Sequence, residues 1–349
     1  MKSPRRGGQV PKNTGGKVDI HAVARAAKTS ISTVSRSFNH PDLVNPATRR
    51  RIDRAVKKLG YIRNRAAQAM HGRRSGTIGL VVPTIDHAIF GEVVQAFSDA
   101  VDAHGFTILM ASHGFDLERE YLGLRKFLEH RVDGIALIGL DHAAETFQLL
   151  DEQRVPAISI WNHAADSPLS CVGANNRAAG AMAARHLLEL GHREIGTVFP
   201  DAAQNDRARG RREGAYAVLE AAGITVPAAW SSEAPYNITQ AKAACAEILR
   251  QAHRPTALLC GNDVLAQGAL FAARHLGVAV PDALSVIGIG DFKGSAEIEP
   301  ALTTIRIPAR EIGTLAGQRL AEMITEGRAD ITRTLCDLRL MPRASTRAL

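Results

Sequence analysis

The chain has 349 residues, of which 45% are hydrophobic and 22% charged, so it is long enough for one small and one large globular domain. Its four cysteines (Cys171, Cys245, Cys260 and Cys336) form no C-x-x-C pair, which argues against a zinc ribbon or a disulfide framework and fits a reducing cytosol. No apolar run approaches the roughly 20 residues that span a bilayer, which excludes a membrane-spanning protein.

The formal net charge of +8 is unevenly distributed along the chain. Residues 1–76 carry 18 Lys or Arg and 3 Asp or Glu, a balance of +15, whereas the other 273 residues have a balance of −7. Residues 1–17 lack the apolar stretch of a secretory signal, and their Gly, Pro and Lys content predicts a disordered basic arm. A cationic head on a mildly anionic body indicates a polyanionic partner, nucleic acid first.

Two short helices are predicted directly after the arm. Apolar residues at helical spacing indicate the first helix: Ile20, Val23, Ala24 and Ala27. Ser30 is a good N-cap for a second helix over residues 31–38, in which Val34 and Phe38 would be buried. Two such helices joined by a short turn form a helix-turn-helix unit, although an ordinary helical hairpin with a polar face fits the same pattern.

The second helix would present four residues outward: Ile31, Ser32, Ser35 and Arg36. Arg36 suits guanine O6 and N7, and Ser32 can address more than one base. A third helix is predicted with Asn45 as its cap and Pro46 at its first position. Its apolar stripe would be Ile52, Val56 and Leu59, and its other face carries Arg49, Arg50, Arg51, Arg54, Lys57 and Lys58. These charges would add to a phosphate-binding field.

From Thr77 onward, strand-like apolar runs alternate with amphipathic helices. The runs are IGLVVP, FTILMAS, VDGIALIGL, VPAISIW, EIGTVFP, TALLCG and LSVIGIG. The helices begin near Gly91, Leu117, Ala143, Arg177, Gly210, Asn237 and Asp263. Such alternation predicts parallel sheets with right-handed crossovers, and two successive sets predict two lobes with a ligand cleft at the carboxyl ends of the strands.

The sequence lacks the common signatures of catalysis. It contains no G-x-x-x-x-G-K-[ST] phosphate loop, no G-x-S-x-G elbow and no H-E-x-x-H motif. Its 13 histidines have no metal-ligand spacing. We therefore expect a protein that is not an enzyme and that needs no cofactor and no metal.

Residues 18–80 resemble the N-terminus of the lactose-repressor/galactose-repressor (LacI/GalR) family of bacterial transcription regulators. The matching segments are VARAA-x-x-S-x-x-TVSR-x-x-N, NPATRRRI, LGY, NRAAQAM and IGLVVP. The resemblance implies an all-α helix-turn-helix head and an α/β two-lobed effector domain, similar to a periplasmic sugar-binding protein. The expected parts are the arm (1–17), the head (18–62), a hinge helix or linker (63–76) and the effector domain (77–349). The first lobe would comprise about 77–174 and 306–334, the second about 175–305 and 335–349, with crossings near Ala174, Ile305 and Leu335.

The resemblance also assigns residues that would contact DNA. The family's base-reading positions fall on Ile31, Ser32 and Arg36, and its phosphate-positioning residues match Ser30, Thr33, Ser35 and Asn39. Residues 64–70 resemble the hinge helix, in which Asn64 lies first, Ala67 allows two such helices to pack and Met70 would wedge into the minor groove. Seven residues are too few for a stable helix in water, so this segment would fold only on DNA.

One position departs from the family pattern. Lys28 stands where the family usually has glycine in the turn between the first two helices. If this residue must adopt a positive φ, lysine costs about 1–2 kcal/mol there. We therefore expect either a strained turn or a slightly different geometry.

The resemblance places Phe90, Arg211 and Asn262 in the effector cleft, with Asn262 rather than Asp263 facing the ligand. Trp161 and Gly290 replace two aspartates of sugar-binding relatives, while Asp291 is kept. The four arginines at the start of one predicted helix are Arg207, Arg209, Arg211 and Arg212. Because a helix N-terminus favours an anion, we expect an anionic effector such as a sugar acid related to gluconate, rather than a neutral sugar. The alternative is that most of these arginines are solvated and only Arg211 enters the pocket.

These observations together predict a cytoplasmic repressor that binds a pseudo-palindromic operator in double-stranded DNA and responds to a small-molecule effector. The chain has no terminal leucine heptads, so we expect a homodimer rather than a tetramer. The alternatives are a purine-type co-repressor-dependent regulator and a solute-binding protein of a transport system, although the basic head argues against the latter.

Overall fold

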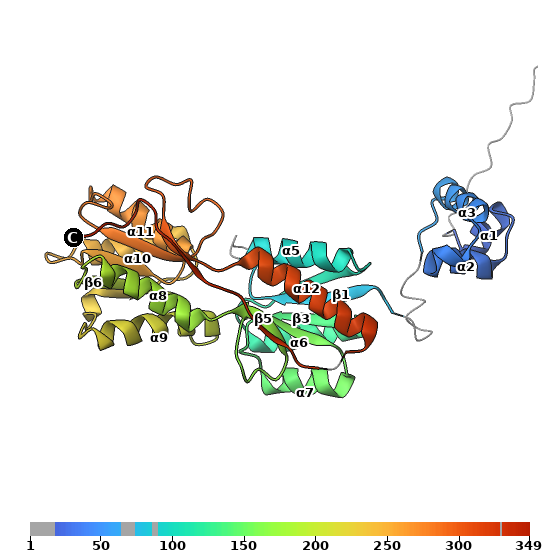
Figure 1. The fold of residues 1–349 in the computed structure, drawn as a ribbon, viewed down its shortest axis with the longest axis horizontal. Coiled ribbons are helices and arrows are strands. Elements are labelled where there is room, and N and C mark those ends of the chain that lie inside the picture. The colour runs from blue at the N-terminus through green and yellow to red at the C-terminus, as the bar shows by residue number, and fades with distance from the viewer. Residues whose placement is uncertain (1–17, 64–73, 86–89, 329) are drawn as a thin grey trace, which may run out of the picture. The chain divides into compact units, whose positions relative to one another are not determined.

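The computed structural model of the protein describes residues 18–63, 74–85, 90–328 and 330–349. The chain divides into two compact units, residues 1–73 and residues 74–349, which we call the head and the body (Figure 1). The predicted arm and the predicted hinge residues Asn64, Ala67 and Met70 lie outside the described residues.

The head contains three α-helices whose limits are set by local capping signals. They are α1 (Ile20–Ala26), α2 (Ile31–Asn39) and α3 (Pro46–Leu59), with a short 3₁₀ helix η1 (Pro41–Leu43). The Ser30 hydroxyl accepts a hydrogen bond from the Thr33 amide at 3.2 Å, and Asn45 accepts one from the Ala47 amide at 2.9 Å. The predicted caps of the second and third helices are therefore confirmed.

The core of the head is small and lies between the three helices. Its buried residues are Val23, Ala24, Ala27, Val34, Ile52 and Ala55, and Phe38 and Tyr61 pack against them. The turn between α1 and α2 places Lys28 at φ +49°, in the left-handed region. The turn thus has the positive φ that suits glycine, and lysine adopts it at an expected cost of about 1–2 kcal/mol.

The first lobe of the body is a parallel six-stranded sheet covered by helices (Figure 1). Its strands are β1 (Thr77–Val82), β2 (Thr107–Ser112), β3 (Gly134–Ile138), β4 (Ala157–Asn162), β5 (Ser170–Ala174) and β11 (Arg333–Leu335), in the order β11-β5-β4-β3-β1-β2. Its helices are α5 (Gly91–Asp102), α6 (Leu117–Glu129), α7 (Ala144–Gln153) and α12 (Ala309–Glu326). The sheet is covered by helices, and accordingly β1, β3, β4 and β5 are almost wholly buried.

The second lobe repeats this design with one antiparallel strand. Its strands are β6 (Ile195–Phe199), β7 (Ser231–Glu233), β8 (Ala257–Cys260), β9 (Ser285–Gly290), β10 (Thr303–Arg306) and β12 (Arg339–Met341), in the order β12-β10-β9-β8-β6-β7. Its helices are α8 (Asn176–Glu189), α9 (Asp206–Ala221), η3 (Ala228–Trp230), α10 (Ile238–Leu249) and α11 (Asp263–His275). Strand β12 pairs antiparallel with β10, whereas the other pairs are parallel, as predicted.

The chain passes between the lobes three times, after β5, after β10 and after β11, because consecutive elements there belong to different sheets. Helix α12 follows the second passage and packs closely on α5, an arrangement that the sequence patterns did not indicate. A Cβ atom added at Gly317 would lie 2.7 Å from the Cβ of Ala100, so glycine is what permits this approach. Within the described ranges, every helix is too short or too polar to cross a membrane.

Candidate functional site

The outward face of α2 carries the residues predicted to contact DNA. The Ile31 side chain is 40% exposed, and Ser32 and Arg36 are also exposed. The Ser30 hydroxyl lies 2.8 Å from the hydroxyls of both Ser32 and Thr33. This face therefore holds a bulky apolar residue, hydroxyls and a guanidinium within one helical turn and a half.

A second group of predicted residues lies at the end of α2. Asn39 donates to the Ser35 hydroxyl at 3.3 Å and accepts a hydrogen bond from Arg63. The Arg63 guanidinium also lies 5.5 Å from the centre of the Phe38 ring. The chain leaving the head is thus tied to the end of the helix that carries Arg36. The six basic residues of α3 named above are all exposed.

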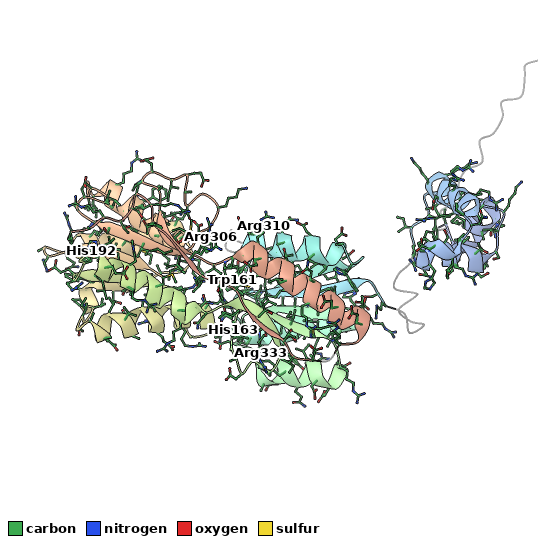
Figure 2. The ribbon with its side chains drawn as sticks, viewed as in Figure 1. Trp161, His163, His192, Arg306, Arg310 and Arg333 are labelled. Atoms are coloured by element: carbon green, nitrogen blue, oxygen red, sulfur yellow. The ribbon has the colours of Figure 1, made fainter. Side chains whose placement is uncertain are left out.

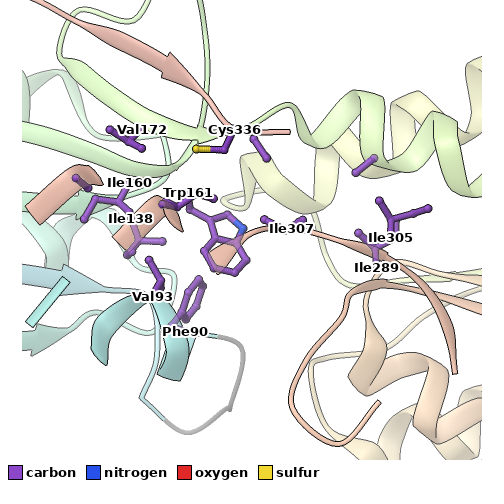
Figure 3. Packing of buried hydrophobic residues seen from close by; sticks show 14 of the residues in the cluster. Phe90, Val93, Ile138, Ile160, Trp161, Val172, Ile289, Ile305, Ile307 and Cys336 are labelled. Atoms are coloured by element: carbon purple, nitrogen blue, oxygen red, sulfur yellow. The ribbon is translucent and has the colours of Figure 1, made fainter. Parts of the chain in front are cut away.

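At the first-lobe side of the cleft, Trp161 and Phe90 meet edge to face. Their ring centres are 5.5 Å apart, with an angle of 76° between the planes. Trp161 ends β4 with φ +85° and is fully buried, and Phe90 precedes α5 (Figures 2 and 3). The indole Nε1 of Trp161 has no hydrogen-bond partner among the described residues. A buried donor without a partner costs stability unless another molecule supplies an acceptor.

At the second-lobe side, Arg211 is held by a close crossing of α8 and α9. A Cβ atom at Gly180 would collide with the Arg211 backbone, so glycine lets α8 approach α9. The Arg211 side chain is 2% exposed; its Nε donates to Asn176 Oδ1 at 2.8 Å and its Nη1 to the Gly261 carbonyl at 3.0 Å. No described carboxylate lies within ion-pair distance of this guanidinium. Burial accordingly lowers the pKa of Arg211 from its ordinary value.

Asn262 and Asp263 follow β8 and have different roles. Asn262 caps α11, and its Oδ1 accepts from the Leu265 amide at 2.9 Å, but its buried Nδ2 has no partner among the described residues. The Asp263 carboxylate accepts hydrogen bonds from the Phe292 amide and from the Ser295 and Thr304 hydroxyls. Burial raises the pKa of Asp263, against those hydrogen bonds. Asn262 thus has a donor to offer, whereas Asp263 is engaged with its own lobe.

Both carboxylate oxygens of Asp291 are engaged by arginines. One oxygen of its carboxylate lies 2.6 Å from Arg306 and the other 2.6 Å from Arg343. Asp291 is kept from the family's effector site, so we also predict that it binds the effector; that contact stays a prediction, and its present partners are the two arginines. The preceding Gly290 has φ +139°, where a Cβ would meet the Phe292 ring, so glycine is required there.

The four arginines of α9 divide into two pairs. Arg207 and Arg211 are buried, and the Arg207 guanidinium lies 5.9 Å from the centre of the Phe90 ring. Arg209 and Arg212 are partly exposed and form ion pairs with Asp141 and Glu233. The sequence predicts either four arginines at an anion site or a single one, Arg211, inside the pocket. The arrangement lies between these, because Arg207 is buried like Arg211 but forms an ion pair with its neighbour Asp206 at 3.0 Å.

Three polar residues of the cleft region escaped the sequence patterns: Asn162, Asn176 and Asp206. The Asn162 amide donates to Asp206 at 2.6 Å and its carbonyl accepts from Asn176 at 2.8 Å. Asn176 and Asp206 are each the first residue of a helix, and this position was the one sequence signal that could have indicated them. The described part of the chain contains no cluster of three or more potential metal ligands.

Two parts of the chain match families of known proteins. Residues 19–64 match the family described as "Bacterial regulatory proteins, lacI family", and residues 184–346 match the "Periplasmic binding protein-like domain". The chain is 32% identical over 328 residues to the HTH-type transcriptional repressor PurR of Escherichia coli O139:H28 (strain E24377A / ETEC), covering 93% of this chain and 96% of that protein.

Two solved structures have the same fold. The transcription regulator GntR from Chromobacterium violaceum is 31% identical with a TM-score of 0.73, over 77% of this chain and 99% of that one. The lac repressor dimer bound to operator and the anti-inducer ONPF is 26% identical with a TM-score of 0.82, over 95% of this chain and 100% of that one.

Proposed function

Since the chain belongs to the LacI family of bacterial regulatory proteins and is a DNA-binding transcription regulator, we propose that it acts in the cytoplasm as a homodimeric repressor controlled by a sugar acid bound in its cleft. In this proposal Ile31, Ser32 and Arg36 contact bases in the major groove. The neighbouring residues Ser30, Thr33, Ser35 and Asn39 position the helix on phosphates. The solute-binding alternative is disfavoured, because residues 19–64 match the family's DNA-binding region.

The effector proposal depends on three buried donor groups, one in the first lobe and two in the second. Trp161 Nε1 and Asn262 Nδ2 are buried without partners among the described residues, and Arg211 is a buried cation without a carboxylate. Three donors and one positive charge favour a ligand that is rich in acceptors and negatively charged. A sugar acid meets both conditions, because its carboxylate would neutralise Arg211 while its hydroxyls accept from the other two donors. A neutral sugar would leave the charge of Arg211 uncompensated.

We expect gluconate and related sugar acids to raise the unfolding temperature of the protein by about 5–10 °C at a hundredfold excess over Kd. Arg211→Gln should abolish this shift, because glutamine keeps a polar side chain but removes the cation. Arg212→Gln is the matched control: it lies on the same helix, 41% exposed and paired with Glu233, and should keep the shift. The measurement is thermal unfolding with sugar acids, neutral sugars and purines. Stabilisation by neutral sugars or purines alone would contradict the proposal.

The homodimer proposal depends on two surfaces of the body that expose large apolar side chains. One groove of about 440 Å³ lies along the edge strand β2 and α6, where Met110 and Leu122 are each 48% exposed. Another, of about 520 Å³, lies against α11, where Phe271 is 47% exposed. The lac repressor structure of the same fold is a dimer on its operator. A second copy of this chain would cover these surfaces and would bring two heads to two half-sites.

We expect Met110→Glu to weaken the dimer at least tenfold, because it places a charge in the covered edge. Leu335→Glu provides the control, since Leu335 is 53% exposed on β11, the opposite edge of the same sheet. Sedimentation equilibrium over a range of concentrations measures the dimer dissociation constant of both variants and of the wild type. A monomeric wild-type protein, or equal weakening by the two substitutions, would contradict the proposed surface.

A further inference from the structure

The end of β3 and the loop that follows it in the first lobe contact the first turn of α9 in the second lobe through three residues. The Ile138 carbonyl accepts a hydrogen bond from Arg207 Nη1 at 3.3 Å. The Leu140 amide donates to Asp206 Oδ2 at 2.7 Å. Arg209 Nη2 lies 2.7 Å from both carboxylate oxygens of Asp141. Residues 138–141 and residues 206–209 therefore face each other along their lengths.

Asp206 is the centre of this contact. Its carboxylate accepts from the Leu140 amide and from Asn162 Nδ2 of the first lobe, and from the backbone and side chain of Arg207 in its own helix. Four donors saturate the two oxygens, and the position at the start of α9 favours a negative charge. Asp206 therefore joins the lobes through charge-assisted hydrogen bonds that need no ligand.

The loop is also fixed from within the first lobe. His142 Nε2 lies 3.1 Å from the Gly139 carbonyl, and its Nδ1 lies 2.9 Å from the buried carboxylate of Glu120. Gly139 has φ +100°, and a Cβ there would lie 3.1 Å from Asp206 Oδ1 as well as against the Arg207 guanidinium. Glycine thus permits the close approach, and His142 holds the glycine in place.

We propose that residues 138–141 and the side chains of Asp206, Arg207 and Arg209 form an interlobe latch, which sets the population of the closed cleft independently of effector contacts. The Leu140 amide, the Asp206 carboxylate and the guanidinium groups of Arg207 and Arg209 all have protein partners, so the contribution of the latch to closure is present before a ligand adds its own. A free energy of closure that is present without ligand raises the fraction of molecules whose cleft is closed and able to hold an effector. It also reduces the change in that fraction that effector binding can produce. This consequence for regulation rests on the proposed function, whereas the latch itself does not.

Hydrogen exchange of the Leu140 amide tests the latch without DNA or effector, because this amide donates across the cleft to Asp206. The experiment uses the full-length protein and mass spectrometry of peptides containing residues 139–142. Arg209→Ala should raise the exchange rate up to about fivefold, the range expected for a partly exposed ion pair. Asp206→Asn should raise it about tenfold or more, because it removes a charged acceptor.

Arg212→Ala is the matched control. Arg212 lies on the same helix and has nearly the same exposure as Arg209, 41% against 40%, but its partner Glu233 belongs to its own lobe. Its replacement should leave the exchange of Leu140 unchanged. The latch is overturned if Arg209→Ala and Arg212→Ala give the same rate as the wild type, a result obtainable even if Asp206→Asn fails to fold. Failure of gluconate binding or of operator binding would instead count against the proposed function alone.

Discussion

Replacing Gly214 by alanine is expected to destabilise the body by about 1–2 kcal/mol, whereas replacing Gly210 on the same helix is expected to stabilise it. A Cβ at Gly214 would collide with the backbone carbonyl of Arg177 in α8 and lie 3.1 Å from the Ala181 amide. Overpacking against backbone costs about 1–3 kcal/mol, and it exceeds the gain of about 1 kcal/mol that alanine brings to a helix interior.

Gly210 has the same helical surroundings without the collision. Its nearest neighbour would be the Arg177 amide at 3.4 Å, an ordinary contact, so the helix-propensity gain remains. Thermal unfolding should show a lower midpoint for Gly214→Ala, by about 3–6 °C, and an equal or higher one for Gly210→Ala. Equal midpoints for the two variants would mean that α8 and α9 do not cross as closely as described. Because Arg211 lies between these glycines, Gly214→Ala should also weaken effector binding.

Arg36→Ala is expected to lower operator affinity about 10- to 100-fold and to relax the preference for one base pair in each half-site. The reason is that Arg36 is exposed on the outward face of α2, where a guanidinium can donate twice to a guanine edge. Its removal should leave binding to random duplex DNA nearly unchanged, since non-specific affinity comes mainly from the many phosphate contacts.

Arg49→Ala provides the comparison, because Arg49 is exposed on α3 and would contact phosphate. It should weaken binding to operator and random DNA by similar factors and reduce the slope of log K against log salt by about 1. Operator selection from a random pool, followed by titrations at several salt concentrations, measures both effects. An Arg36 variant that loses operator and random DNA equally would place this arginine on the phosphates.

The head could be predicted from sequence because its signals are local. Ser30, Asn45 and Pro46 each define a helix start within three residues, and the family's glycine at position 28 raised the possibility of the positive φ that Lys28 adopts. The alternation of strands and helices likewise gave the parallel sheets and the two lobes. Helix α12 was missed although it has a buried apolar stripe, and its contact with α5 joins segments about 200 residues apart at Gly313 and Gly317.

The cleft was predicted only in part. The Phe90 and Trp161 rings are in contact, and Arg211 donates to the Gly261 carbonyl, but whether these residues and Asn262 hold an effector stays a prediction. The pairing of Asp206 with Leu140 and Asn162 could not be anticipated, since these partners lie 66 and 44 positions away and belong to the other lobe. The two arginines that hold the Asp291 carboxylate, Arg306 and Arg343, could likewise not be anticipated, because they lie 15 and 52 positions away in the sequence.

The three passages between the lobes limit how the body can move. Two rigid bodies joined by one strand have nearly all six degrees of freedom relative to each other, but three short, neighbouring connections leave little beyond rotation about a common axis. Within the second lobe, the Asp291 carboxylate binds Arg306, where the second passage begins, and Arg343, beyond the end of the third, so it fixes the ends of two of these connections. Relative motion of the lobes is therefore mainly a rotation about one axis, and this rotation is the coordinate on which contacts in the cleft would act.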